Sequence, residues 1–296
     1  HWTDAESVAT DDVLAGKSPF LNPAWYIGAT LVFGGIYYFI GHRLRRLSIL
    51  EGIKGSMEFN EHKRMRIYAA IFLPLAGFTS AALIWLWVMS VDAHWYSTLF
   101  AWYNGASWLV AMLCITVLLM IYLKNLGYYE ELTREHIHDV GKYIFAFSIF
   151  WTYLWFSQYM LIWYGNIGEE TFYFNRQIDQ YPILFYTNLI INFALPFIIL
   201  MPNTTKRTFG TMTFVASVVL LGHWLDYFLM IKPGTLHTAH ELMSHGHEAA
   251  GHGGGHFALG FNIPGFLDIG TLLGFAGLFL WIVFDQLSKA PLVAKK

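Results

Sequence analysis

The chain has 296 residues, of which 56% are hydrophobic and 13% charged, and its formal net charge is −2. Soluble domains carry about 25% charged residues, so this composition places the chain in a membrane. We expect lipids around it and no nucleic-acid partner. Cys114 is the single cysteine, which excludes an iron–sulfur cluster or a c-type haem attached by this chain alone.

Apolar segments of about 20 to 25 residues recur along the chain, a length that suits spanning helices rather than barrel strands. The pattern predicts an all-α integral membrane protein with seven transmembrane helices in a bundle. The predicted spans are residues 22–41, 67–91, 99–123, 143–164, 182–201, 208–231 and 267–287. The chain then divides into an external N-terminal segment (1–21), a six-helix membrane region (22–231), an external His- and Gly-rich loop (232–266), a last transmembrane helix (267–287) and a cytoplasmic tail (288–296).

Basic residues concentrate on alternate loops of this arrangement. Fifteen of the 18 lie on one side of the predicted bundle, whereas Lys17, Arg176 and Lys232 lie on the other. Because cytoplasmic loops carry an excess of Lys and Arg, we expect the C-terminus in the cytoplasm and residues 232–266 in the periplasm. The odd number of helices and the lack of an initiator Met lead us to expect an N-terminal piece before His1, with removal of a signal sequence as the alternative.

The fourth predicted span has titratable groups at both ends. Residues 136–170 read HIHDVGKYIFAFSIFWTYLWFSQYMLIWYGNIGEE. The groups at its two ends are His136, His138, Asp139 and Lys142, then Glu169 and Glu170. The polar groups between them, which lipid would penalise unless they face protein or water, are Ser148, Thr152, Ser157 and Gln158. Such a pattern is typical of a proton route, although the spacing alone favours an ordinary spanning helix with solvated ends.

Particular sequences in this segment carry a resemblance. The stretches HDVGK, FSQYMLIWY and NIGEE, with LNPAWY near the start and GHWLDYFLMI later, resemble the polysulfide-reductase-type (NrfD-like) membrane subunits. They are most similar to the second such subunit of bacterial alternative complex III, a quinol:electron-acceptor oxidoreductase. The resemblance is most specific over residues 136–171 and looser elsewhere. The family has about ten spanning helices, so three further helices before His1 would complete the fold.

The resemblance implies a place in a respiratory complex of the bacterial cytoplasmic membrane. Its partners would be a sister NrfD-like subunit, iron–sulfur subunits and c-type haem subunits, and the haem and iron–sulfur clusters would lie in those partners. The sister subunit is the one usually credited with quinol oxidation. We therefore expect no cofactor in this chain, while quinol binding stays open.

A layer of polar side chains is predicted near the outer ends of four spans. At 1.5 Å per residue, most of them fall at a depth of roughly 8–12 Å. They are Asn104, Ser107, Gln158, Asn188, Asn192, His223 and Asp226. His223 and Asp226 are three residues apart and share a helix face, and this pair favours function: it could pass protons or bind a quinol hydroxyl. For the asparagines and Gln158, function and hydrogen bonding between helices remain equal alternatives.

Other features favour ordinary roles. We expect the aromatic residues near the start of the third span, Trp95, Tyr96, Trp102 and Tyr103, to form an interfacial belt or a lipid-facing surface. Pro196 is expected to kink its span. The loop 232–266 holds His237, His240, His245, His247, His252 and His256. Its Gly-rich composition favours a mobile loop over a metal site.

The leading hypothesis is a membrane subunit of a quinol-oxidising respiratory complex that supports assembly and proton translocation. Its proton-path candidates are His136, His138, Asp139, Lys142, Gln158, Asn188, Asn192, His223 and Asp226. One alternative is that this chain itself binds quinol, with His223 and Asp226 accepting the protons. Another is a stand-alone transporter or a purely structural membrane scaffold.

Overall fold

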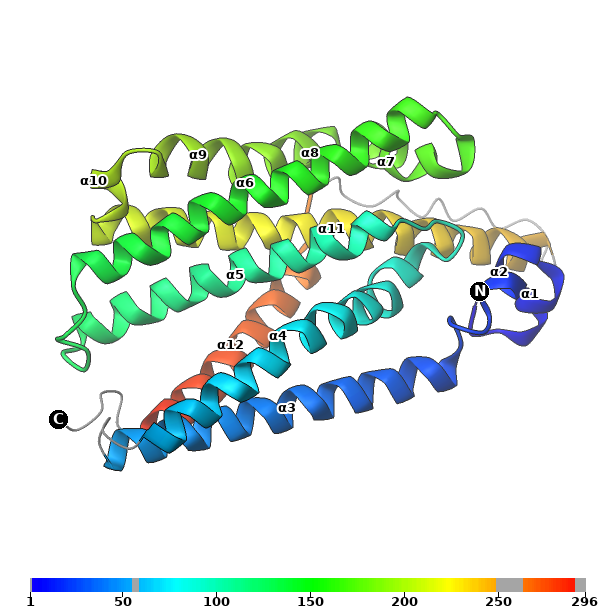
Figure 1. The fold of residues 1–296 in the computed structure, drawn as a ribbon. Helices are drawn as coiled ribbons and strands as arrows, with labels where there is room; N and C mark the ends of the chain where they lie inside the picture. Colours follow the sequence, from blue (N-terminus) through cyan, green and yellow to red (C-terminus); the bar gives the residue numbers. More distant parts are fainter. Residues whose placement is uncertain (1, 55–58, 249–262, 291–296) are drawn as a thin grey trace. The chain divides into compact units, whose positions relative to one another are not determined.

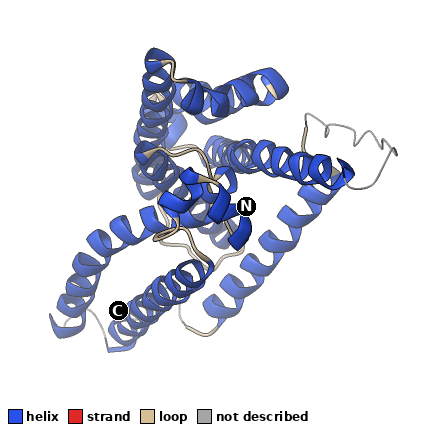
Figure 2. Ribbon diagram, turned by 90° about the vertical axis from the view of Figure 1, so that its right-hand side faces the viewer, coloured by secondary structure: helices blue, strands red, loops and turns tan. Residues whose placement is uncertain are grey.

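The computed structural model describes residues 2–54, 59–248 and 263–290. All regular secondary structure in these residues is helical (Figures 1 and 2). In chain order the helices are α1 (Ala5–Thr10), α2 (Asp12–Lys17), α3 (Pro23–Lys54), α4 (Phe59–Trp87), a 3-10 turn η1 (Met89–Asp92), α5 (Thr98–Asn125), α6 (Arg134–Gly165), α7 (Gly168–Gln180), α8 (Pro182–Leu189), a π-helical turn η2 (Ile190–Ala194), α9 (Leu195–Leu200), α10 (Asn203–Lys206), α11 (Phe209–Glu248) and α12 (Phe266–Ser288).

The chain forms two compact units. The first comprises His1–Leu86, Gly127–Tyr129 and Phe266–Lys296, and contains α1 to α4 together with α12. The second comprises Trp87–Leu126 and Glu130–Gly265, and contains α5 to α11.

Polar contacts join the helices of the first unit, while most of its apolar surface stays open. The hydroxyls of Tyr37 on α3 and Thr79 on α4 lie 2.6 Å apart. Arg45 of α3 donates to the carbonyl of Gln286 on α12, over 2.9 Å. Helix α12 has no buried residue in this unit, and Leu73 of α4 is 72% exposed. Side chains as apolar as these require lipid or protein around them.

The second unit holds a dense core. In it α5 packs against α6 and α11, and the segment α8–η2–α9 packs on α6 and α11 (Figure 1). Many apolar residues in the middle and C-terminal part of α5 and in the N-terminal halves of α6 and α11 are fully buried. They include Val110, Cys114, Val117, Ile137, Ile144, Met212, Val215 and Val219. Gly141 permits a close approach here, because an added Cβ would lie 3.2 Å from the sulfur of Met212.

Six helices in the described part of the chain are long and apolar enough to cross a membrane, so the protein is a multi-pass helical membrane protein. They are α3, α4, α5, the α8–η2–α9 segment, α11 and α12. The predicted count of seven also includes α6, whose 32 residues exceed the bilayer length. Its many Tyr and Trp residues and its Gln make α6 less apolar, so the seventh crossing stays a prediction.

One predicted loop differs from the structure in its first half. Residues 232–248, expected as the first half of a loop, continue α11 through Pro233. The chain stays helical there because a proline ring removes only one backbone hydrogen bond, which can kink a helix without ending it. Of the histidines predicted in that loop, His252 and His256 lie outside the described residues.

The π-helical turn η2 interrupts the fifth predicted span just before Pro196. The amide of Leu195 donates to the carbonyl of Ile190, five residues earlier. Proline cannot donate to the carbonyl four residues before it, so the chain around Asn192 lacks one α-helical bond and widens. Such turns rotate the side chains that follow and are frequent at functional sites.

Candidate functional site

The carboxyl group of Asp226 lies at the centre of a buried polar network in the second unit. Asp226 is 2% exposed. Its Oδ1 accepts hydrogen bonds from the Tyr103 hydroxyl on α5 and from Nδ2 of Asn188 on α8, the latter at 2.8 Å. Its Oδ2 is buried without a hydrogen-bond partner among the described residues. Side chains from two other helices therefore bind one carboxyl oxygen, while no side chain among the described residues is hydrogen-bonded to the second.

The network continues from Asn188 to Asn192. Nδ2 of Asn192 donates to Oδ1 of Asn188 over 2.6 Å, four residues earlier. Asn192 lies in the π-helical turn and reaches α11 at Gly222, where an added Cβ would collide with the side chains of Ile191 and Asn192. The absence of a side chain at position 222 thus lets α11 approach the π-helical turn.

His223 lies one turn before Asp226 on α11 and makes a separate polar contact. Its Nδ1 lies 2.9 Å from Oγ of Ser107 on α5, and its ring packs edge-on against Trp151 of α6. Its Nε2 is buried and has no partner in the described structure. His223 and Asp226 therefore both present one satisfied and one unsatisfied polar atom to the interior.

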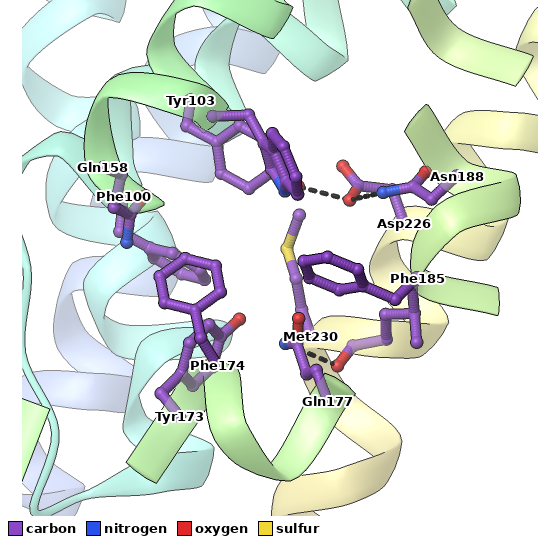
Figure 3. A pocket seen from close by; sticks show the side chains of 12 residues that line it. Phe100, Tyr103, Gln158, Tyr173, Phe174, Gln177, Phe185, Asn188, Asp226 and Met230 are labelled. Carbon is purple, nitrogen blue, oxygen red and sulfur yellow. Dashed lines mark hydrogen bonds between the residues drawn. The ribbon is translucent and has the colours of Figure 1, made fainter. Parts of the chain in front are cut away.

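A small cavity adjoins Asp226. Its polar lining comes from Tyr103, Gln158, Gln177, Asn188 and Asp226, and seven largely apolar side chains complete the wall. The volume within which the centre of a water molecule can lie is about 10 Å³, which is roughly enough for one water. Figure 3 shows Asp226 and Asn188 on one side of this cavity and Gln158 on the other, with Met230 between them. Nε2 of Gln158 is buried and unpaired among the described atoms.

Helix α7 forms part of the cavity wall. It contributes Tyr173, Phe174 and Gln177 to the wall, and Nε2 of Gln177 donates to the carbonyl of Leu229 on α11 over 3.1 Å. The ring of Tyr173 stacks on Trp95 with centroids 4.0 Å apart. Burial raises the pKa of the Tyr173 hydroxyl, so this group stays neutral.

An ion pair fixes α7 to the chain before α5. Nη2 of Arg176 lies 2.6 Å from Oδ2 of Asp92, and the two side chains are 7% and 9% exposed. Asp92 also lies close to Gly234 of α11, where an added Cβ would come within 2.8 Å of the carboxylate. One buried contact therefore brings η1, α7 and α11 together.

The four titratable residues predicted as a proton entrance do not converge at one point. Nδ1 of His136 accepts from the amide of Thr133 over 3.1 Å and so caps α6. Asp139 and Lys142 form an exposed pair with 2.7 Å between Nζ and Oδ1. Lys142 holds the pKa of Asp139 below its usual range and Asp139 raises the pKa of Lys142, so both stay charged at neutral pH. His138 is largely buried, with Nδ1 3.8 Å from a carboxylate oxygen of Glu135.

The core between that cluster and the polar network is mostly apolar. Its fully buried residues include Val110, Val117, Ile144 and Val215. Of the polar residues predicted along α6, Ser148 is buried with its hydroxyl unpaired in the described structure. Thr152 donates back to the carbonyl of Ser148 over 2.8 Å. Of the predicted path residues, the structure therefore brings together Gln158, Asn188, Asn192, His223 and Asp226, and leaves the other four apart.

Sequence reasoning missed Tyr103 and Gln177, which line the cavity, and Trp95 and Arg176, which lie beside it. Tyr103 and Trp95, expected in an interfacial belt, are 4% and 2% exposed. Tyr103 lies four residues before Ser107, on the same face of a helix, and this spacing could have revealed it. Gln177 and Arg176 lie in a short amphipathic helix after the predicted span, where a polar residue is ordinarily expected to face water, so nothing in the sequence marks these two as buried.

The chain matches no protein-family profile and no curated protein. Its fold and site together define a multi-pass helical membrane protein with a buried carboxyl network in one of its two units.

Proposed function

We propose that this protein is a membrane subunit that moves protons at Asp226, within a quinol-oxidising respiratory complex. The observation that carries the proton role is the carboxyl of Asp226, with one oxygen bonded by two helices and the other unpaired in the described structure. An ionisable residue within a span costs roughly 2.5–3.5 kcal/mol on insertion scales, less near the surface. Purely structural contacts between helices do not require such a group.

The arrangement favours a half-channel over a route through the whole bilayer. Polar side chains gather at the end of the unit where α7 lines the cavity, and the core beyond His223 is mostly apolar. A proton could pass between the carboxyl of Asp226 and a water in the cavity, and the amide of Gln158 would orient that water by a hydrogen bond. His223 would offer a second site through the Nε2 atom that has no partner in the described structure.

The respiratory role rests on the resemblance to NrfD-like subunits at residues 136–171. We propose a sister NrfD-like subunit and partners carrying iron–sulfur clusters and c-type haem. Quinol oxidation fits the sister subunit better than this chain, because the cavity at Asp226 has room for about one water. In the same proposal α6 is the seventh span and the C-terminus lies in the cytoplasm.

The test is a matched pair of variants in the complex purified through this chain. Asp226→Asn keeps the shape of the side chain and removes its proton, and Asp139→Asn does the same in an exposed pair. We expect Asp226→Asn to slow turnover and proton uptake while the complex stays assembled, with Asp139→Asn much closer to wild type.

Each part of the proposal can fail separately. Wild-type proton uptake in Asp226→Asn would make the network a structural contact between helices. Purification of the chain without any haem- or cluster-bearing partner would refute the respiratory role and leave the proton site to be tested by itself.

A further inference from the structure

A basic cleft lies between α3 and α4 in the first unit, near the ends of these helices that residues 55–58 join in sequence. Its volume is about 400 Å³, and its lining is Arg43, Arg46, Leu47, Leu50, Arg64 and Tyr68. Ligand sites commonly measure about 300–1,000 Å³. This cleft belongs entirely to one unit and shares no residue with the network around Asp226.

The charge of the cleft is of one sign. Three arginines line it, and its lining among the described residues includes no carboxylate. Within the described residues, Arg43 contacts the ring of Phe39 at 5.2 Å. The neighbouring carboxylate of Glu51 lies 3.3 Å from His62, and Glu61 is buried. With no carboxylate in the described lining, the three arginines present positive charge to whatever enters the cleft.

The chemistry of the lining fits a phosphate ester. Guanidinium groups bind phosphate oxygens with two parallel hydrogen bonds, and the hydroxyl of Tyr68 can donate a further one. Leu47 and Leu50 give the cleft an apolar side. Exposed apolar residues continue from it along both helices, among them Leu31, Phe39 and Ile71.

We propose that this cleft binds the phosphate of an anionic phospholipid, whose acyl chains run along α3 and α4. Basic pockets between spanning helices bind such headgroups, and the apolar surface beside the arginines favours a lipid over free phosphate. This inference does not depend on the proposed proton role.

The experiment uses the full chain in nonionic detergent and measures lipid binding by native mass spectrometry. The probes are phosphatidylglycerol, phosphatidylcholine and inorganic phosphate. Arg46→Gln/Arg64→Gln removes one cleft charge from each helix. The matched control, Lys63→Gln/Arg66→Gln, removes two exposed charges from the same region outside the cleft.

We expect the wild type and the control to bind phosphatidylglycerol more tightly than phosphatidylcholine, and the cleft variant to lose about tenfold or more of that affinity. Circular dichroism checks that both variants fold. Equal losses in the two variants would indicate diffuse surface charge and overturn the proposal. Competition by inorganic phosphate at concentrations comparable to the lipid would assign the cleft to free phosphate and also overturn it.

Discussion

Ser107 on α5 and His223 on α11 are hydrogen-bonded, with 2.9 Å between Oγ and Nδ1. The bond from Tyr103 to Asp226 lies one turn away on both helices. The partners advance along α5 while they retreat along α11, so these two antiparallel helices are joined by two successive polar contacts. These two contacts fix the register of α5 on α11, and they orient His223 and Asp226 toward the interior of the second unit.

Removal of one contact should disturb the site without breaking the fold. Tyr103→Phe deletes the hydroxyl that donates to Asp226 and leaves Asn188 as the remaining donor. Loss of one partner of a buried hydrogen bond costs about 1–3 kcal/mol. We expect a lower unfolding temperature in detergent and slower proton uptake. An unchanged value of both would mean that the hydroxyl has no share in holding the carboxyl.

The approach of α11 to the π-helical turn should be sensitive to a single methyl group. Gly222→Ala would place a Cβ against Ile191 and Asn192, whereas Gly210→Ala on the same helix meets nothing within 4 Å. Overpacking costs typically about 1–3 kcal/mol, while Ala in an open helical position gains up to about 1 kcal/mol over Gly.

Thermal unfolding of these two glycine variants should therefore shift in opposite directions. Equal shifts would show that the space beside Gly222 is larger than the structure indicates.

The ion pair that anchors α7 should matter far more than an exposed pair of similar length. Asp92→Asn leaves Arg176 as a buried charge without its partner, which costs about 3–5 kcal/mol. Asp139→Asn breaks a solvated pair and should change stability little. Thermal unfolding compares the two, and limited proteolysis of α7 reports local loosening. If the two variants unfold at similar temperatures, the ion pair of Arg176 with Asp92 does not anchor α7.

The seventh crossing can be tested with single cysteines in a Cys114→Ser background. Tyr128→Cys precedes α6 and Glu169→Cys follows it, and both positions are exposed. If α6 spans the membrane, a membrane-impermeant thiol reagent should label the two positions from opposite sides. Labelling of both from one side would reduce the bundle to the six crossings of the other helices.

The helical architecture was predictable from the sequence because apolar runs of bilayer length have few other solutions. The polar layer of Asn188, Asn192, His223 and Asp226 was predictable from depth counting, since these residues lie on spanning helices of regular rise. The role of Tyr103 was not predictable, because an aromatic residue near the start of a span is expected equally in an interfacial belt and in a protein core. The sequence also could not show that His136 and Asp139 lie apart from the polar network. A helix cap and an exposed ion pair use the same residue types as a proton entrance.

The central claim is that the carboxyl of Asp226 takes up and releases a proton. Infrared difference spectroscopy of the full chain across a pH titration measures this directly, through the carboxyl C=O stretching band that appears when a buried acid is protonated. We expect this band in the wild type and in Asp139→Asn, and its absence in Asp226→Asn. An identical band in Asp226→Asn, or no titrating carboxyl band in the wild type, would contradict the account.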